Sequence, residues 1–288
     1  MDANPILVEQ TRGSHVENRH RGAFVIADAE GNVIAAGGDI ARPVFPRSAI
    51  KSMQALAMVT SGAIDRFALS DEQLALACAS HHGEEVHVTG VQDFLGHLGF
   101  SGANLECGAH PPTNGKAREA LRAAGLQPTA LHNNCSGKHS GMLSVARALG
   151  VDPAGYVERE HPVQVAVRSA IETVIGASLS VDLCGRDGCS IPTWAAPLKG
   201  FATGFAKMAT GRGLPPDLGA AARRIFDAAT THPLLVAGTG HFDTLTMAAF
   251  GGRVMQKGGA EGVQCGAIRD KGWAMRSNAM TATWRRAW

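Results

Sequence analysis

Arg47-Ser-Ala-Ile-Lys-Ser-Met-Gln-Ala-Leu56 opens a segment with helical spacing of apolar residues and contains the only Ser-x-x-Lys of the chain. On a helix, the side chains of Ser48 and Lys51 share one face, with Cβ atoms roughly 5–6 Å apart. A serine hydroxyl becomes a useful nucleophile when a base takes its proton. Lysine can be that base if burial or nearby positive charge, such as that of Arg47, lowers its pKa. An ordinary helix surface can carry the same pattern by chance. The motif alone therefore does not distinguish a catalytic pair from two surface residues, and the rest of the chain is needed.

The composition narrows the class of protein. The 288 residues are 45% hydrophobic and 18% charged, as in an ordinary globular protein. With 27 basic and 25 acidic side chains and no block of like charge, neither nucleic acid nor an anionic membrane is an expected partner. No run reaches the ~18 apolar residues of a membrane span, and no signal peptide is recognised. The six cysteines form no dense framework, which favours reduced thiols and a cytoplasmic location.

The first two thirds of the chain predict a hairpin followed by helices. Residues 23–27 and 33–36 are rich in β-forming residues and flank Glu30-Gly-Asn32, which has the chemistry of a turn. Helical periodicity follows over residues 48–61, and Ser70-Asp-Glu-Gln73 has the pattern of a capping box that opens a helix. Further helices are expected near residues 84–98, 115–124, 138–149, 161–176 and 217–230.

The last third predicts a return to strands. The apolar stretch Phe242 to Phe250 and the pair Val254-Met255 suggest a second hairpin. An early hairpin, central helices and late strands predict an α+β fold, in which helices pack against a mostly antiparallel sheet. Residues 1–274 are expected to form a single domain. Residues 275–288 show no helix or strand period and are interpreted as an atypical tail, truncated or shifted in reading frame.

A polar segment, Asn134-Cys-Ser-Gly-Lys-His139, raises the question of metal binding. Cys135 and Cys189 are candidate thiolate ligands, and Asp187 and His139 could add a third ligand or support the first ones. The spacing is not that of a standard zinc site, and two buried free cysteines would produce the same sequence. The residues alone leave both interpretations open.

Ser80 and Lys257 are further candidates for chemistry. Ser80 ends an apolar helical segment and precedes two histidines and a glycine, a position from which a hydroxyl can face a cleft. Lys257 follows an expected strand and precedes Gly-Gly, where the backbone can approach a ligand closely and the amine can serve as an anchor or a base. A surface lysine would fit the same residues. The Cys-x-x-His spacings at 78–81 and 107–110 fit inert thiols better than a metal site.

Taken together, these segments resemble the bacterial L-asparaginases of the Rhizobium etli type, also called the thermolabile or asparaginase II family. The resemblance is specific as a set, because the matching blocks occur in order along most of the chain. These blocks are Val16-Glu-Asn18 with His20, Arg47-Ser-Ala-Ile-Lys51, Cys78-Ala-Ser-His81, Cys107-Gly-Ala-His-Pro111, Asn134-Cys-Ser-Gly-Lys-His139 with Gly141-Met142, Asp187-Gly-Cys189 with Pro192-Thr193, His232-Pro233, Val236-Ala-Gly238 and Lys257. It fades after about Trp273.

The resemblance implies a serine β-lactamase-like fold and two Ser–Lys pairs, Ser48 with Lys51 and Ser80 with Lys257. It also implies a zinc site whose ligands are Cys135, Lys138 and Cys189, and it makes a homodimer unsurprising. Lysine must be neutral to bind zinc, so metal binding and pH should be linked. Arg47 and Asp187 are then expected to bind the carboxylate and ammonium of the substrate, and His139 to support or orient it.

The activity that this resemblance implies is hydrolysis of the side-chain amide of L-asparagine. Ser48 is expected to attack the amide carbon while Lys51 accepts its proton, and water then hydrolyses the β-aspartyl ester. Ser80 and Lys257 could assist or supply a second nucleophile. Two alternatives stay open: a glutaminase or penicillin-recognising hydrolase with the same nucleophile, and an inactive zinc-binding relative. One methylene separates glutamine from asparagine, which is worth only about 1–3 kcal/mol in a pocket.

Overall fold

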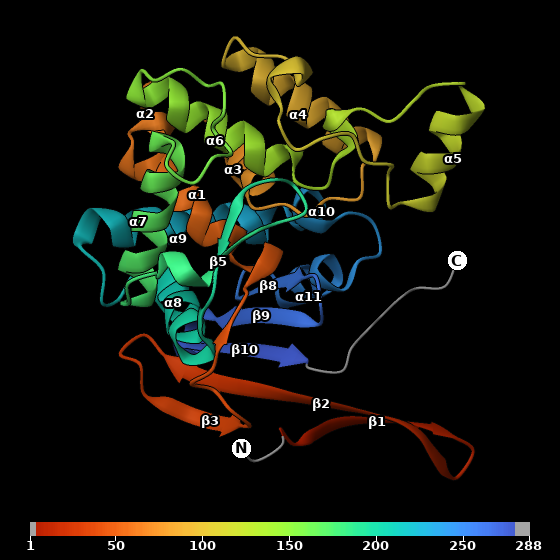
Figure 1. Ribbon diagram of the computed structural model, residues 1–288, viewed down its shortest axis with the longest axis vertical. Helices are drawn as coiled ribbons and strands as arrows, with labels where there is room; N and C mark the ends of the chain where they lie inside the picture. The colour runs from red at the N-terminus through yellow and green to blue at the C-terminus, as the bar shows by residue number, and fades with distance from the viewer. Residues whose placement is uncertain (1–3, 280–288) are drawn as a thin grey trace.

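One antiparallel sheet joins the first and last elements of the chain. The computed structural model describes residues 4–279, and within them a six-stranded sheet runs in the order β1, β2, β10, β9, β8, with β3 paired to β2 (Figure 1). The strands are β1 (Ile6–Arg12), β2 (His15–Asp28), β3 (Val33–Gly37), β8 (Val254–Gly259), β9 (Val263–Ile268) and β10 (Trp273–Ala279). All of the pairings are antiparallel, so the predicted α+β class with an antiparallel sheet is confirmed.

The helices gather on one side of this sheet (Figure 1). They are α1 (Lys51–Thr60), α2 (Ala63–Arg66), α3 (Asp71–Ala77), α4 (Glu85–His97), α5 (Gly115–Ala123), α6 (Ser136–Leu149), α7 (Pro162–Ile175), α8 (Leu198–Thr210), α9 (Pro216–Thr231), α10 (Pro233–Ala237) and α11 (Phe242–Phe250). Helix α8 contacts β2, β9 and β10, while α11 lies against β8. Helix α1 packs between α6, α7 and α9, so the segment that carries Lys51 runs through the centre of the molecule.

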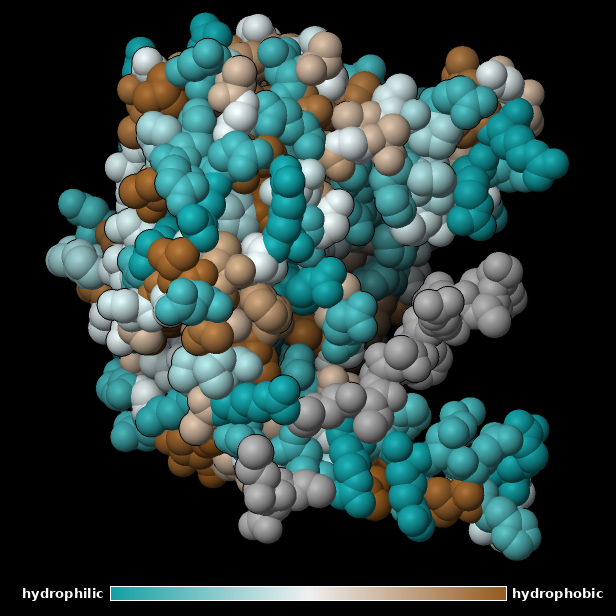
Figure 2. Space-filling model, viewed as in Figure 1, coloured by the Kyte–Doolittle hydropathy of each residue, from teal (hydrophilic) through white to brown (hydrophobic). Residues whose placement is uncertain are grey.

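Alternation along β2 explains how the sheet meets the helices. Val25 and Ala27 point to one face and are fully buried against Leu198 and Ala202 of α8. Residues at alternate positions of a strand share a face, so these side chains form an apolar layer between sheet and helix. The first half of β2 pairs only with β1, and the two strands form an exposed ribbon. Figure 2 shows this ribbon extending from the body, with polar and apolar side chains mixed along it.

Most of the predicted elements are present. The early hairpin consists of β2 and β3, although β2 begins already at His15. Ser70 accepts a hydrogen bond from the backbone of Gln73, whose side chain accepts one from the backbone of Ser70, so the capping box at the start of α3 is confirmed. The five further helices expected between residues 84 and 230 correspond to α4, α5, α6, α7 and α9.

The second hairpin was placed wrongly. Phe242–Phe250 is a helix, α11, and β8 turns into β9 instead. The His241 side chain caps the helix by accepting from the backbone of Asp243, and Gly251 ends it in a left-handed conformation. Because Phe242 and Leu245 stay largely exposed, the apolar run did not signal a strand buried on both faces. Helix α8 was not predicted.

Regular structure also continues beyond residue 274. The segment from Trp273 to Ala279 is β10, a central strand between β2 and β9, so Met275 lies in a strand where the sequence showed no period. The alternation is hidden because the inward position 276 holds an arginine rather than an apolar residue. The remainder of the tail interpreted as truncated or shifted, residues 280–288, lies outside the described residues.

Candidate active site

Ser80, Lys51 and Lys257 meet at the centre of the site. The Nζ atoms of Lys51 and Lys257 each donate a hydrogen bond to Ser80 Oγ, and both are 2.9 Å long. Lys51 begins α1, Ser80 follows the end of α3, and Lys257 lies on β8, so three separate elements supply the group. Lys51 also donates to the carbonyl oxygens of Ala79 at 2.5 Å and Asn134 at 3.4 Å. A hydroxyl held between two amines is a candidate for deprotonation.

Ser48 lies beside this group but is arranged differently from the expected pair. It belongs to a 3₁₀ turn, η1 (Arg47–Ile50), which precedes α1 and leaves its side chain half-buried. Within residues 4–279 no hydrogen bond joins Ser48 to Lys51, whose amine turns to Ser80 instead. Strand β8 approaches η1 closely, because a Cβ added at Gly259 would lie 3.2 Å from the backbone nitrogen of Ala49. The turn therefore sits against the edge of the sheet.

Burial controls the protonation of both amines. Lys51 and Lys257 are 0% and 1% exposed. Desolvation lowers the pKa of Lys257 to about 8, with the charge of Asp243 opposing this shift and that of Lys51 adding to it. Desolvation likewise lowers the pKa of Lys51, although the neighbouring thiol of Cys135 favours its charged form. The neutral form of Lys257, which can accept a proton, is thus accessible near neutral pH.

Arg47 and Asp187 form an ion pair at the rim of the site. Arg47 Nε donates to Asp187 Oδ1 at 2.9 Å, with side-chain exposures of 28% and 12%. Arg47 has a left-handed backbone, φ 51°, which is uncommon for a non-glycine residue and marks a locally strained turn. Burial by itself would raise the pKa of Asp187, but the charges of Lys138 and Arg47 hold that pKa below its ordinary value. The pair is available to contact a zwitterion.

The three predicted metal ligands also come together. Lys138 Nζ donates to Cys189 Sγ at 2.9 Å, and the Cys135 and Cys189 thiols are hydrogen-bonded to each other. All three side chains are buried. The bond from Cys189 lowers the pKa of Cys135, and the same bond raises the pKa of Cys189, so one proton is shared between two sulfurs. Burial by itself would lower the pKa of Lys138. The combined electrostatic effect of Cys135 and Cys189 is larger, so the pKa of Lys138 is raised.

This donor set fits zinc in its chemistry. Two sulfur atoms and one amine nitrogen in mutual contact match the S and N ligands that zinc prefers. All three must lose protons to coordinate, because each now holds or shares one. No cluster of three His, Cys, Asp or Glu side chains suited to a metal occurs among residues 4–279, so a site here depends on the lysine as a ligand.

Small residues bring Lys138 to this position. Cys135 immediately precedes α6, and Lys138 lies one helical turn further on the same face. A Cβ added at Gly137 would lie 2.2 Å from the carbonyl oxygen of Leu76, so α6 can approach α3 only because residue 137 is glycine. Asn133 fixes the loop ahead of the helix by donating to the Cys107 and Gly108 carbonyls and accepting from the backbone of Cys135.

His139 is fully buried behind the cysteines. Its Nδ1 lies 2.6 Å from the hydroxyl of Tyr156, and its Nε2 has no hydrogen-bond partner within the described residues. Desolvation, followed by the charges of Lys138 and Lys51, lowers the pKa of His139 well below its ordinary value. The imidazole is therefore neutral at physiological pH, and Nε2 is an unsatisfied polar atom in reach of the charged groups of the site.

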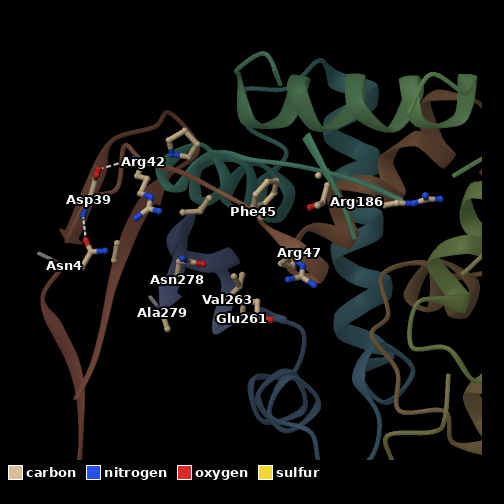
Figure 3. Close-up of a pocket in the computed structure, with 15 residues that line it drawn as sticks. Asn4, Asp39, Arg42, Phe45, Arg47, Arg186, Glu261, Val263, Asn278 and Ala279 are labelled. Atoms are coloured by element: carbon tan, nitrogen blue, oxygen red, sulfur yellow. Dashed lines mark hydrogen bonds between the residues drawn. The ribbon is translucent and has the colours of Figure 1, made fainter. Parts of the chain in front are cut away.

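A cavity of about 800 Å³ opens next to Arg47 (Figure 3). Figure 3 shows Phe45, Arg47 and Val263 along one part of it and Asp39, hydrogen-bonded to Asn4, along another. The lining includes Arg47 but neither of the two candidate serines, and neither Lys51 nor Lys257. The cavity therefore adjoins the rim of the site rather than its reacting groups.

Sequence reasoning missed one buried acid in this region. Asp243 lies in the first turn of α11, is 1% exposed, and its Oδ2 atom is 4.0 Å from Lys257 Nζ. It was passed over because it stands inside the apolar run that was taken for a strand. A single carboxylate in such a run, next to a capping histidine, is the signal that could have drawn attention to it.

Most of the chain matches a known protein family. Residues 8–277 match the family described as L-asparaginase II. The chain belongs to the L-asparaginase II family. The family match continues to residue 277, past the point near Trp273 where the resemblance was expected to fade. Membership identifies the chain as an amidohydrolase, with the amide of asparagine as the bond that the family hydrolyses.

Two solved structures are similar to this L-asparaginase II family chain. One is a β-lactamase from Mycobacterium bovis, with 16% identity, a TM-score of 0.42, and coverage of 89% of this chain and 86% of the other. The second is a presumed β-lactamase from Bacteroides dorei, with 11% identity, a TM-score of 0.48, and coverage of 92% and 87%. The comparison with curated proteins gave no match. No helix of the described residues combines the length and apolar character needed to cross a membrane.

Proposed function

We propose that this chain hydrolyses L-asparagine to L-aspartate and ammonia through an ester with a serine, activated by neutral lysine. The observation that carries the proposal is the position of Ser80 Oγ, 2.9 Å from the amines of both Lys51 and Lys257. A nucleophile within hydrogen-bond reach of its base, with that base held by further groups, is the arrangement that covalent catalysis requires.

The reaction follows from these contacts in two stages. Ser80 Oγ attacks the side-chain amide carbon while a lysine amine takes the hydroxyl proton, and the resulting ammonium returns a proton to the departing nitrogen. Ammonia leaves and a β-aspartyl ester remains. A water then attacks the ester and gives a proton to the same amine, and the ammonium so formed returns that proton to Ser80 Oγ as aspartate leaves. Because the pKa of Lys257 is lowered to about 8, Lys257 is the amine that we assign as the base.

Ser48 is the second candidate for the nucleophile. It lies on the turn before Lys51 and is half-buried, so a substrate can reach it. The absence of a hydrogen bond from Lys51 to Ser48 among the described residues favours Ser80 as the activated hydroxyl. Under this assignment Ser48 contacts the substrate or its leaving group.

Charge complementarity supports an amino-acid substrate. Asparagine carries one carboxylate and one ammonium on its α-carbon, and the site presents one guanidinium, Arg47, and one carboxylate, Asp187. Both are partly exposed, so the substrate can exchange their mutual contact for two contacts of its own. The neutral His139 lies deeper and supports this region through its bond to Tyr156.

Zinc is proposed as the metal of the neighbouring cluster. Cys135, Lys138 and Cys189 would hold it, since their sulfur and nitrogen atoms already lie in mutual contact. Zinc held there would supply positive charge that could polarise or orient an oxygen of the substrate. The cluster is linked to the reacting groups through Lys51, whose amine interacts with Cys135.

The decisive experiment is ammonia release from L-asparagine by the zinc-loaded chain, with L-glutamine as the competing substrate. Ser80→Ala should lower kcat by at least about 10³-fold, because loss of the nucleophile removes the covalent route. Ser169→Ala is the matched control, since this serine is exposed on α7, away from the lysines. Trapping of the acyl-enzyme and mass spectrometry of its peptides would identify the esterified serine.

Each outcome has a definite meaning. Turnover that survives in Ser80→Ala and disappears in Ser48→Ala would transfer the nucleophile to Ser48. Turnover that survives in both variants would refute the Ser–Lys mechanism. Faster release from glutamine would assign a glutaminase. A folded, zinc-loaded wild type that releases no ammonia from either amide would identify an inactive zinc-binding relative.

A further inference from the structure

A buried carboxylate, that of Asp243, lies close to the proposed base Lys257. Its Oδ2 atom accepts a hydrogen bond from the backbone of Gly258 at 2.7 Å, and its Oδ1 accepts from Gln264 Nε2 at 3.1 Å. The same Oδ2 lies 4.0 Å from Lys257 Nζ. Asp243 thus connects the first turn of α11 with the strands β8 and β9, and its carboxylate faces the base from a fixed direction.

Lys257 sits among several charged or titratable groups. Those that face it are Asp243 on α11, Lys51 on α1, Cys78 at the end of α3, Cys135 ahead of α6 and Cys265 on β9. Asp243 is the one carboxylate in this set, as far as the described residues extend. His241 Nδ1 lies 3.7 Å from the same Oδ2 atom of that carboxylate.

This arrangement gives Asp243 a task that neither serine nor Lys51 performs. Desolvation and the nearby charge of Lys51 both favour a neutral Lys257, and the carboxylate opposes them. Without it, the amine would lose its proton at a lower pH, and the ammonium formed when the amine accepts the serine proton would lose the countercharge that contributes most to its pKa. A buried ammonium without a partner is strongly disfavoured.

We propose that Asp243 is a positioning residue for the reaction: it aligns Lys257 through the backbone of Gly258 and stabilises the ammonium that Lys257 becomes during catalysis. The proposal rests on the proposed function in taking Lys257 as the base. Within the described residues Asp243 makes no hydrogen bond to Ser80, and under this proposal it acts through Lys257. Gln264 holds the second oxygen, so that the carboxylate keeps one orientation.

Asp243→Asn tests the role of the charge. The amide can still accept from the backbone of Gly258, but it removes the negative charge beside Lys257. Because an opposite charge at 4–6 Å shifts a pKa by about 1–3 units, the titration midpoint of Lys257 should fall by that amount. The midpoint is read from the ¹⁵N resonance of Nζ in lysine-labelled protein, assigned by its loss in Lys257→Arg. This measurement needs no substrate, so it remains informative if the chain releases no ammonia.

The second measurement is the pH dependence of kcat, for the same proteins with matched zinc content. The acid limb of the kcat profile for asparagine should move to lower pH by the same 1–3 units in Asp243→Asn, while the kcat at its plateau falls about 10–100-fold. Asp243→Glu keeps the charge and should keep the midpoint near that of the wild type. Gln264→Leu is the control for a purely structural role, since it breaks a bond to Asp243 without removing the charge.

The results separate the two proposals. A midpoint that stays fixed in Asp243→Asn, or moves equally in Gln264→Leu, overturns the role of Asp243. A shifted Nζ midpoint with an unshifted kcat profile also overturns it, since Lys257 would then not set the rate. A shifted midpoint in a protein without amidase activity leaves the electrostatic pairing in place and refutes only the proposed function. If Asp243→Asn does not fold, Asp243→Ser provides the same loss of charge with room for water.

Discussion

Arg276 is a buried cation that has no acidic partner within residues 4–279, and replacing it tests how much a buried charge costs the fold. It lies on β10 with 0% exposure, on the face of the sheet that meets the helices. Its Nη1 donates to Cys265 Sγ at 2.9 Å and its Nη2 to the Phe45 carbonyl at 3.5 Å, while Nε has no partner among the described residues. Burial raises the pKa of Cys265, so the thiol supplies no countercharge at neutral pH.

The balance between the cost of burying Arg276 and the contacts that it makes determines whether its replacement stabilises or destabilises the fold. Burial of one ion costs several kcal/mol even after relaxation of the surroundings. Against this, the guanidinium lies 5.0 Å from the centre of the Phe201 ring, a contact worth up to about 2 kcal/mol. Its two hydrogen bonds are weaker than is usual for a charged donor, because one ends on a sulfur atom and the other is 3.5 Å long, and each contributes about 1 kcal/mol. We therefore expect Arg276→Met, which fills similar space with an apolar chain, to stabilise the fold by about 1–4 kcal/mol.

The assay is urea unfolding followed by tryptophan fluorescence, with Tm measured in parallel. A gain of about 2 kcal/mol should raise Tm by roughly 4–8 °C. Arg253→Met serves as the control, because this arginine is 62% exposed and 4.0 Å from Asp270, and its loss should change stability by no more than about 0.5 kcal/mol. If Arg276→Met lowers stability by 1 kcal/mol or more, the contacts of the guanidinium outweigh the cost of burying its charge, and the reasoning is refuted.

Three further predictions concern the metal cluster and its support. Gly137→Ala should destabilise the fold by about 1–3 kcal/mol, because its Cβ would lie 2.2 Å from the carbonyl oxygen of Leu76. Urea unfolding measures this change, and an unchanged urea midpoint would show that α6 can move away from α3 at no cost. Zinc binding, followed by calorimetry in buffers of different ionisation enthalpy, should release protons and tighten as pH rises, because Lys138 begins protonated with a raised pKa. Cys189→Ser should weaken that binding by at least about 10-fold, and equal affinity in the variant would place the metal elsewhere.

Local signals predicted several elements correctly because each depends on neighbouring residues. The capping box at Ser70 needs only Gln73, three positions away, and the turn between β2 and β3 needs only its own glycine and polar residues. The apolar run at 242–250 failed for the opposite reason. Whether such a run becomes a helix or a strand depends on what covers it, and α11 leaves part of its apolar surface exposed.

The Ser-x-x-Lys motif shows the same limit at the site. Its spacing correctly marked Ser48 and Lys51 as neighbours along the chain, but a lysine amine sits at the end of a flexible four-carbon stem. In the folded chain that amine reaches Ala79 and Ser80, 28 and 29 positions away. Spacing fixes where a side chain begins, and packing fixes where its charged end lies.

The sequence by itself determined the family, the α+β class, and the residue types of the site, because these are properties of motifs and of local periodicity. Only the tertiary structure decided that Lys257 meets Ser80 across 177 positions, and that Asp243 lies close to that lysine. The physical reason is that burial sets the protonation of each amine, and burial is created by helices and strands that are distant in sequence. The motifs therefore supply the reactive side chains of the site, and the packing of α11 and β8 determines which of these side chains meet.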